Sequence, residues 1–170
     1  LSFVAAPDYE TPTDANADNV YDVVVQVSDG TLTDSQAIAV TVTDVNDIAP
    51  VITSNGGGAS ASVNIAENAT AVTTVTATDV DGPSLTYSIA GGSDAAMFTI
   101  NASTGALSFV AAPDYESPTD AGGNNVYDVI VQVSDGTLTD SQAIAVTVTS
   151  LNEAPTGLAP ASAAVDINAS

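Results

Sequence analysis

The sequence predicts an all-β chain built from tandem Greek-key β-sandwich domains of seven strands each. Three observations carry this prediction. Apolar residues recur at every second position, clusters of Gly, Asn, Asp and Pro separate these runs at short intervals, and one long stretch occurs twice. An apolar period of two is typical of strands that bury one face, whereas helices show a period near 3.6. Short strands separated by regular turn signals favour a sandwich.

Internal repetition sets the expected domain organisation. Residues 1–43 and 107–149 align with a constant offset of 106 positions, and 38 of the 43 positions are identical. We therefore expect residues 1–48 to be the C-terminal part of one repeat, residues 49–153 a complete repeat, and residues 154–170 the start of a following repeat. A unit of about a hundred residues can bury its own core, unlike solenoid repeats of roughly 20–45 residues. We expect a segment of a longer array of domains.

Within the complete repeat, the predicted strands follow one another at turn signals such as Asp81-Gly82-Pro83, Gly91-Gly92 and Asp135-Gly136. The alternating apolar positions are, in order, Val63 and Ile65; Leu85, Tyr87 and Ile89; Phe98 and Ile100; Leu107 and Phe109; Tyr127, Val129, Val131 and Val133; and Ile144, Val146 and Val148. The last two runs are the longest and predict two long strands near the end of the repeat.

The charge composition predicts a divalent cation as partner. The chain has 21 Asp and Glu residues and no Lys, Arg or His, which gives a formal net charge of −21. No acidic side chain can pair with a basic one, so each must be solvated, hydrogen-bonded or bound to metal. Carboxylate and amide oxygens are the ligands that Ca²⁺ prefers. With no cysteine present, disulfides cannot cross-link the domains, and calcium is the cross-link that remains.

The same composition argues against several functions. Affinity for nucleic acid depends on Lys and Arg, which the chain lacks. We recognise no signal peptide and no run of 18 or more apolar residues, so we expect no membrane insertion in this segment. Paired carboxylates can support glycosidase or two-metal chemistry, but such a site needs a concave pocket, whereas these acids gather between domains. We therefore expect no enzyme.

Four acidic motifs follow one another in a fixed order. They are Ala66-Glu67-Asn68 near the first strand, Asp79-Val80-Asp81 after the second, Pro113-Asp114-Tyr115-Glu116 after the fifth, and Asp44-Val45-Asn46-Asp47 where one repeat meets the next. This set resembles the cadherin repeat, in the form found in long bacterial surface adhesins, and the resemblance covers nearly the whole chain. It implies a cadherin/immunoglobulin-like sandwich in which loops at the facing ends of two domains bind about three calcium ions.

The resemblance implies a ligand set at the first junction. The side chains are those of Asp8 and Glu10 in the incoming repeat, Asn46 and Asp47 in the linker, and Asp79, Asp81 and Asp135 in the outgoing repeat, with the carbonyl groups of Val45, Ile48 and Gly82 as further ligands. One more acid of the family pattern would precede residue 1.

The second junction departs from this pattern. Its implied ligands are Glu67, Asp114, Glu116, Asn152 and Glu153. The linker here reads Ser150-Leu151-Asn152-Glu153, so Ser replaces Asp44 and Glu replaces Asp47, and the segment from Val165 to Asn168 lacks the Glu-Asn motif. We expect this site to be weaker, to hold fewer ions or to join a different type of repeat.

These observations predict a calcium-rigidified spacer or adhesion segment of a bacterial extracellular adhesin or fibre, exposed at the cell surface. Its partners would be calcium and the neighbouring repeats of the same chain. Three alternatives remain open: a module that binds surface polysaccharide, a homophilic cell–cell binding module that pairs with like chains, and a subunit that assembles laterally into a filament. A surface adapted to high salt would explain the acids without any metal.

Overall fold

The computed structural model describes residues 1–82 and 84–153, and the expected third repeat (154–170) lies outside them. The strands are β1 (Val20–Ser28), β2 (Thr33–Thr41), β3 (Val51–Ile52), β4 (Ser60–Ala66), β5 (Ala71–Thr74), β6 (Ala77–Thr78), β7 (Thr86–Gly91), β8 (Phe98–Ile100), β9 (Ala106–Phe109), β10 (Val126–Ser134) and β11 (Thr139–Thr149). Two short 3-10 turns, η1 (Ser54–Gly56) and η2 (Ala95–Met97), are the helical elements of the described residues. Neither is long enough to cross a membrane, and no other described segment forms a membrane-spanning helix.

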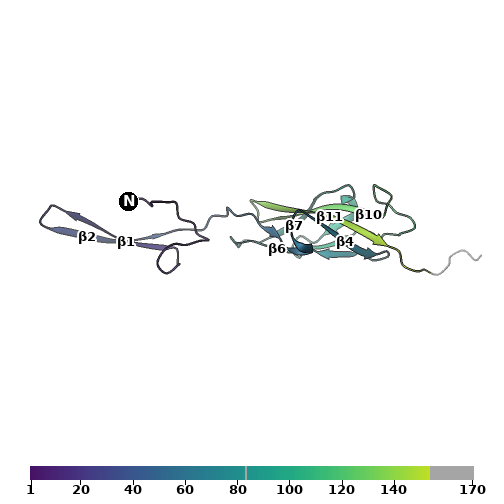
Figure 1. The fold of residues 1–170 in the computed structure, drawn as a ribbon, viewed down its shortest axis with the longest axis horizontal. Coiled ribbons are helices and arrows are strands. Elements are labelled where there is room, and N and C mark those ends of the chain that lie inside the picture. Colours follow the sequence, from purple (N-terminus) through teal and green to yellow (C-terminus); the bar gives the residue numbers. More distant parts are fainter. Residues whose placement is uncertain (83, 154–170) are drawn as a thin grey trace, which may run out of the picture.

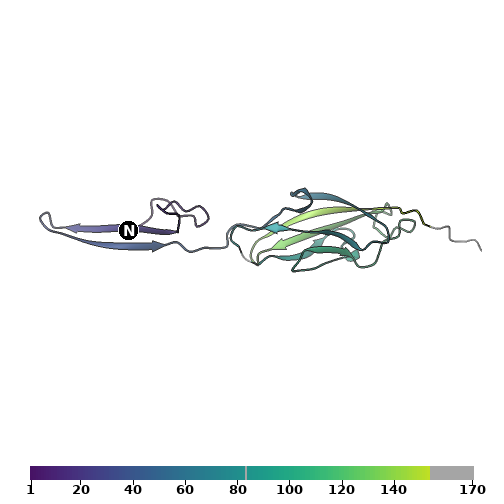
Figure 2. The same cartoon turned by 90° about the horizontal axis from the view of Figure 1, so that it is seen from below.

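Strands β3 to β11 form a sandwich, which confirms the predicted all-β fold (Figures 1 and 2). One sheet has the order β4-β11-β10-β7, with β4 parallel to β11 and the other neighbours antiparallel. The other layer contains the sheet β5-β9-β8 and the short pair β3-β6. The predicted count of seven strands is not confirmed, because nine strand segments are present. The second predicted strand is divided into β5 and β6 around Val75, and β3 pairs with β6.

The alternating residues of β10 and β11 build the centre of the core. Tyr127, Val129, Val131 and Val133 are each at most 1% exposed, and Ile144, Val146 and Val148 are equally buried. The facing sheet contributes Phe98, Leu107 and Phe109. The Phe109 ring lies 4.4 Å from that of Phe98 and 5.0 Å from that of Tyr127, measured between centroids. The predicted period of two therefore identifies the buried face correctly.

One glycine has a clear structural role in this packing. Gly105 has a φ of +70°, and a Cβ atom built on it would lie 2.0 Å from the carbonyl oxygen of Val75. A side chain cannot occupy that space, so glycine allows the turn between β8 and β9 to reach the backbone between β5 and β6. The Val75 amide donates to the Gly105 carbonyl at 2.9 Å, which fixes the contact.

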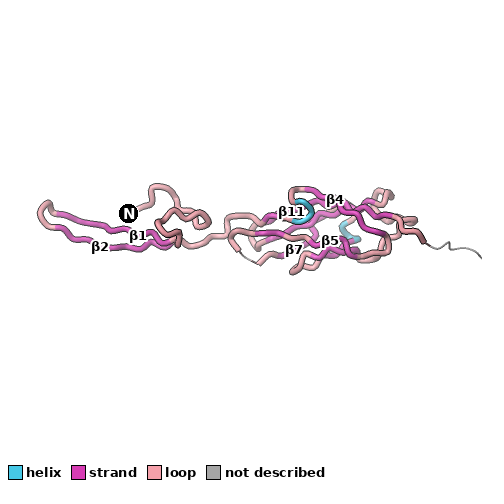
Figure 3. The backbone as a smooth tube through the Cα atoms, turned by 60° about the horizontal axis from the view of Figure 1, so that its bottom comes forward, coloured by secondary structure: helices cyan, strands magenta, loops and turns pink. Residues whose placement is uncertain are grey.

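The β1–β2 hairpin repeats the β10–β11 pair. Val23 faces Ile38 in the first pair, and Val129 faces Ile144 in the second, in the same antiparallel register. In Figure 3 the hairpin stands beside loop segments only, without a second sheet over it. Its inner face is therefore open, and Val25 and Val27 are 42% and 67% exposed.

A short linker joins the hairpin to the sandwich, and the two lie end to end (Figures 1 and 3). At its start, the Val42 amide donates to the Asn19 carbonyl at 2.9 Å. At its end, Pro50 is buried, and the Ile52 amide donates to Asp140 Oδ2 at 2.8 Å. Both ends of the linker are thus anchored to β-structure.

Candidate metal centre at the repeat junction

The acids of the first junction are positioned by tight local turns. Asp8 Oδ1 accepts hydrogen bonds from the amides of Glu10 at 3.0 Å and Thr11 at 3.1 Å. In the same way, Asp79 Oδ1 accepts the amide of Asp81 at 3.1 Å. Each motif therefore uses its first acid to fix a turn that presents the second one. Asp acts in this way because its short side chain reaches the backbone two residues further on.

Three of the expected ligands meet at one point. Carboxylate oxygens of Glu10, Asp47 and Asp81 all lie within 4.8 Å of one another, although they come from the hairpin side, the linker and the loop after β6. Like charges at this distance repel, and a bound cation would turn that repulsion into attraction. The described chain contains no basic side chain that could do so.

Around this point, several buried oxygens lack a hydrogen-bond partner among the described residues. They are Glu10 Oε1, Asn46 Oδ1, Asp79 Oδ2, Asp81 Oδ1 and Asp135 Oδ2. Asp135 as a whole is only 8% exposed. Buried polar atoms nearly always have a partner. A donor set made only of oxygen fits Ca²⁺ well and lacks the sulfur and imidazole ligands of typical zinc sites.

The pKa values of two expected ligands, Glu10 and Asp135, reflect this environment. Burial raises the pKa of Glu10 above its usual range, and the nearby charges of Asp81 and Asp44 raise it further. Burial also acts to raise the pKa of Asp135, but hydrogen bonds from the Leu138 and Thr137 amides outweigh it, with a further contribution from the neighbouring Asn46 side chain, and lower the pKa. Asp135 is therefore held as a carboxylate beside Asn46.

The structure places one further acid of the linker motif, Asp44, near Glu10. Asp44 was placed in the linker motif but not among the ligands, yet its carboxylate lies close enough to Glu10 to affect its ionisation. Its position at the start of the acidic linker motif was the available signal. Conversely, Asp8 is exposed and is not part of the three-carboxylate cluster. The carbonyl groups of Val45, Ile48 and Gly82 remain predicted ligands.

The second junction brings together three of its five expected ligands. Carboxylate oxygens of Glu67, Asp114 and Glu116 lie within 4.8 Å of one another. Glu67 is 2% exposed, and its two oxygens accept the amides of Leu151 at 2.6 Å and Tyr115 at 2.9 Å. These two bonds lower the pKa of Glu67 despite its burial. Burial and the charges of Glu67 and Asp114 raise the pKa of Glu116.

The remaining two expected ligands are Asn152 and Glu153, and Glu153 is not among these three clustered carboxylates. Glu153 Oε1 accepts a hydrogen bond from Asn68 Nδ2 at 2.8 Å, and Asn152 is exposed. Ser150, which stands in the place of Asp44, donates weakly to Glu116 Oε1 at 3.5 Å. A neutral hydroxyl group thus faces Glu116 where a carboxylate faces Glu10.

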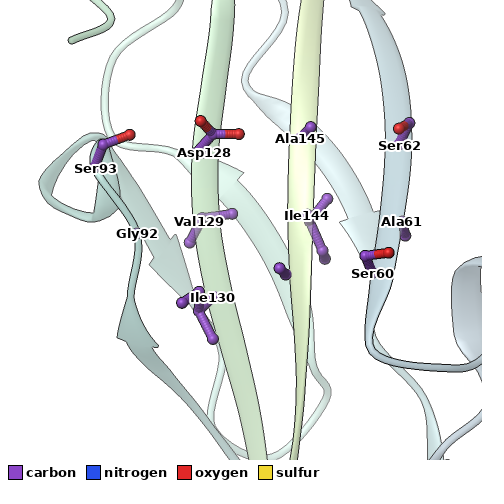
Figure 4. A pocket seen from close by; sticks show the side chains of 11 residues that line it. Ser60, Ala61, Ser62, Gly92, Ser93, Asp128, Val129, Ile130, Ile144 and Ala145 are labelled. Carbon is purple, nitrogen blue, oxygen red and sulfur yellow. The ribbon is translucent and has the colours of Figure 1, made fainter.

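A separate shallow groove of about 580 Å³ crosses the outer face of the four-stranded sheet. Figure 4 shows Asp128, Ala145 and Ser62 in one row across β10, β11 and β4. The groove is hollow because its strands carry small side chains, and no aromatic residue lines it. It therefore lacks the flat aromatic surface on which sugar rings stack.

Comparison with known proteins identifies the family. Residues 61–150 match the cadherin domain family. The chain belongs to this family. Cadherin domains are adhesion-type extracellular modules rather than enzymes, and they generally bind calcium. The match begins in β4 and ends just after β11, so it covers most of the complete repeat and includes Glu67, Asp79, Asp81 and Asp135.

Solved structures show the same fold over more of the chain. Mouse clustered PcdhgC3 EC1-3 is 22% identical with a TM-score of 0.64, and covers 87% of this chain and 46% of its own. The protocadherin gammaB7 EC3-6 cis-dimer structure is 26% identical with a TM-score of 0.59, covering 82% and 35%. Mouse Cadherin-23 EC22-24 is 20% identical with a TM-score of 0.59, covering 83% and 45%. The chain thus spans less than half the length of each. A search of curated proteins gives no match.

Proposed function

We propose that this chain is a calcium-rigidified spacer segment of an extracellular adhesion protein. The observation that carries the proposal is the set of five buried, unpartnered oxygens at the first junction. They come from the hairpin side, the linker and two loops of the sandwich, and no described basic side chain neutralises them. Calcium bound there would join the hairpin side, the linker and the sandwich at one point.

The residues present fit a calcium ion by number and chemistry. Glu10, Asp47 and Asp81 form the centre of the cluster, and Asn46, Asp79 and Asp135 supply further oxygens. Ca²⁺ takes about 6–8 oxygen ligands with loose geometry. Shared carboxylates would allow more than one ion at the junction. Asp44 adds a further charge beside Glu10.

The mechanical effect follows from the electrostatics. Without metal, the carboxylates of the hairpin side repel those of the sandwich, so an open angle at the junction is favoured. With calcium, the same groups bind a common cation and the angle between repeats is fixed. A row of such junctions is stiff and would hold a binding end away from its anchor. The near-identity of the two repeated stretches suits a spacer, in which repeat number matters more than individual surfaces.

The proposal extends to location and partners. The acidic composition, the absence of Lys and Arg, and the resemblance to bacterial adhesin repeats support a place on a bacterial cell surface. The partners would be calcium and neighbouring repeats. Binding of polysaccharide in the groove of Figure 4 receives less support, because no aromatic residue lines that groove. Lateral assembly would use the free edges of β4 and β7.

Isothermal titration calorimetry of the 170-residue chain tests the proposal. Calcium is titrated into metal-free protein at a constant ionic strength of monovalent salt, with magnesium titrated in parallel. We expect saturable binding of calcium with a defined stoichiometry, and weaker binding of magnesium because it demands a stricter geometry. If calcium gave no more heat than added monovalent salt, the acids would be surface charge and the proposal would be wrong.

A further inference from the structure

We infer that two carboxylates, the half-buried Asp81 and the buried Glu67, hold the linkers by accepting hydrogen bonds from their backbone amides, whether or not metal is bound. The two carboxylates accept hydrogen bonds from different linker positions, and we call each such contact a grip. Without metal, the joint between two repeats therefore bends only in the short linker stretch that lies between the two grips. These hydrogen bonds do not depend on the proposed function. Only their second role, which is to limit where the metal-free joint bends, rests on the proposed function.

Asp81 holds the linker from the side of the following repeat. Its Oδ2 atom accepts the amide of Asp47 at 3.0 Å and the amide of Ile48 at 2.7 Å, across more than thirty residues of sequence. Two successive amides aimed at one oxygen form an anion-binding nest. The other oxygen, Oδ1, is buried and unpartnered among the described residues and lies in the acid cluster. One oxygen of the Asp81 carboxylate therefore binds the linker backbone, and the other faces the candidate metal position.

Glu67 holds the linker from the side of the preceding repeat. At the second junction its Oε1 atom accepts the amide of Leu151 at 2.6 Å, while its own amide donates to the Thr149 carbonyl at 3.0 Å. Leu151 is the equivalent of Val45 in the repeat alignment, which has an offset of 106 residues. The described residues contain no equivalent of Glu67 for Val45. The first junction shows a linker held at its fourth and fifth positions by the following repeat, and the second shows one held at its second position by the preceding repeat. From the two together we infer that a linker between complete repeats is held at all three positions.

Only one linker residue lies between the two grips, namely Asn46 or its equivalent Asn152. Loss of metal acts differently on the two kinds of contact. Carboxylates that face one another across the joint repel, whereas a carboxylate that accepts amide hydrogen bonds keeps a favourable charge-assisted interaction. Without metal, the carboxylates that face one another across the joint move apart, while the hydrogen bonds from the linker amides to Asp81 and Glu67 persist. Among the described residues, Asp81 holds the first linker through the amides of Asp47 and Ile48, and the hinge would lie on the N-terminal side of Asp47.

Amide hydrogen exchange followed by NMR in excess chelator, at constant ionic strength, tests the inference. The amides of Asp47, Ile48 and Leu151 should exchange about tenfold or more slowly than unstructured amides, because each bond to a charged acceptor must break first. The Val45 amide has no such grip and should exchange freely. In D81A, the Asp47 and Ile48 amides should lose protection while Leu151 keeps it. In E67Q, Leu151 should lose part of its protection while Asp47 and Ile48 keep theirs.

The amides of Val131 and Val146 serve as folding controls, since both residues are 0% exposed in the sandwich core. Their protection should not change in either variant. Should D81A disturb them, D81N provides the measurement, because it keeps the shape of the side chain and removes its charge. Free exchange of Asp47 and Ile48 in the metal-free wild-type chain would overturn the inference, and so would protection that survives in both Asp81 variants. Because the experiment contains no calcium, a failure to bind calcium in calorimetry leaves its result unaffected.

Discussion

Val27 and Val133 occupy the same position in their two repeats and have opposite surroundings. Val27 is 67% exposed, whereas Val133 is 0% exposed. The neighbouring sequence is identical, as is the strand pairing, with Val27 opposite Asp34 and Val133 opposite Asp140. The difference comes from the second sheet, which covers β10 and β11 and has no counterpart over β1 and β2 in the described residues.

This pair predicts unequal effects of one substitution on stability. Val133→Ala should lower the free energy of unfolding of the sandwich by about 2 kcal/mol, because it removes buried methyl groups and leaves a cavity. Val27→Ala, the matched control, should change it by less than about 0.5 kcal/mol, as is usual for exposed sites. Urea unfolding followed by circular dichroism measures both. Equal losses would mean that the hairpin is packed in solution.

Removal of one ligand charge should weaken calcium binding. Asp81→Asn and Glu10→Gln should each raise the calcium dissociation constant of the first junction by about tenfold or more, since even outer residues of metal sites affect affinity by that factor. Asp128→Asn removes an exposed carboxylate on the outer sheet face and should leave affinity unchanged. Calorimetry of the three variants gives the comparison. If all three lost affinity equally, general surface charge would be responsible.

The difference between Asp44 and Ser150 predicts unequal junctions. Asp44→Ser copies the second linker into the first, and it should raise the calcium dissociation constant roughly tenfold, because one carboxylate beside Glu10 becomes neutral. Asp22→Ser makes the same change at an exposed position in β1 and is the control. If the calcium dissociation constant of Asp44→Ser were unchanged, the serine at the equivalent position 150 could not be the cause of weaker calcium binding at the second junction.

Acid stability should depend on Asp120. Burial acts to raise the pKa of this carboxyl, but hydrogen bonds from the Asn124 and Asn125 amides, both at 2.9 Å, outweigh it and lower the pKa. Because the folded pKa lies below the unfolded one, the stabilisation is complete above about pH 4 and is lost as the pH falls through the folded pKa.

Asp120→Asn should therefore be less stable than wild type at pH 6 and should lose less stability between pH 5 and pH 3. Urea midpoints in chelator across this range measure the effect without a contribution from bound metal. Parallel pH profiles of the two proteins would contradict it.

Much of the fold could be predicted from the sequence because its strands alternate strictly. Tyr127, Val129, Val131 and Val133 were expected on one face and are buried together. The short strand β3 was not foreseen, since a two-residue strand such as Val51–Ile52 carries no period, and neither was the division of the second predicted strand into β5 and β6. Ile52 is held there by Asp140, whose hydrogen bond across 88 residues no local pattern reveals.

The candidate site was predictable in composition but not in detail. Carboxylate oxygens of Glu10, Asp47 and Asp81, which the order of the acidic motifs assigned to one junction, lie within 4.8 Å of one another. That order did not show that Asp81 also binds the linker amides, or that Glu153 binds Asn68. Residue type indicates which side chains can be ligands, whereas their competing hydrogen bonds depend on how the loops are folded.

The claim that calcium stiffens the junction is tested most directly by a distance measured across it. The chain has no native cysteine, so S35C on β2 and S62C on β4 can carry a pair of spin labels at exposed positions. A second pair, S62C with T104C, lies within the sandwich and reports whether it stays folded. Double electron–electron resonance should give one narrow distance distribution across the junction with calcium and a broad one in chelator, while the pair within the sandwich stays unchanged. The same distribution across the junction in both conditions would contradict the calcium lock and leave the acids as solvated surface charge.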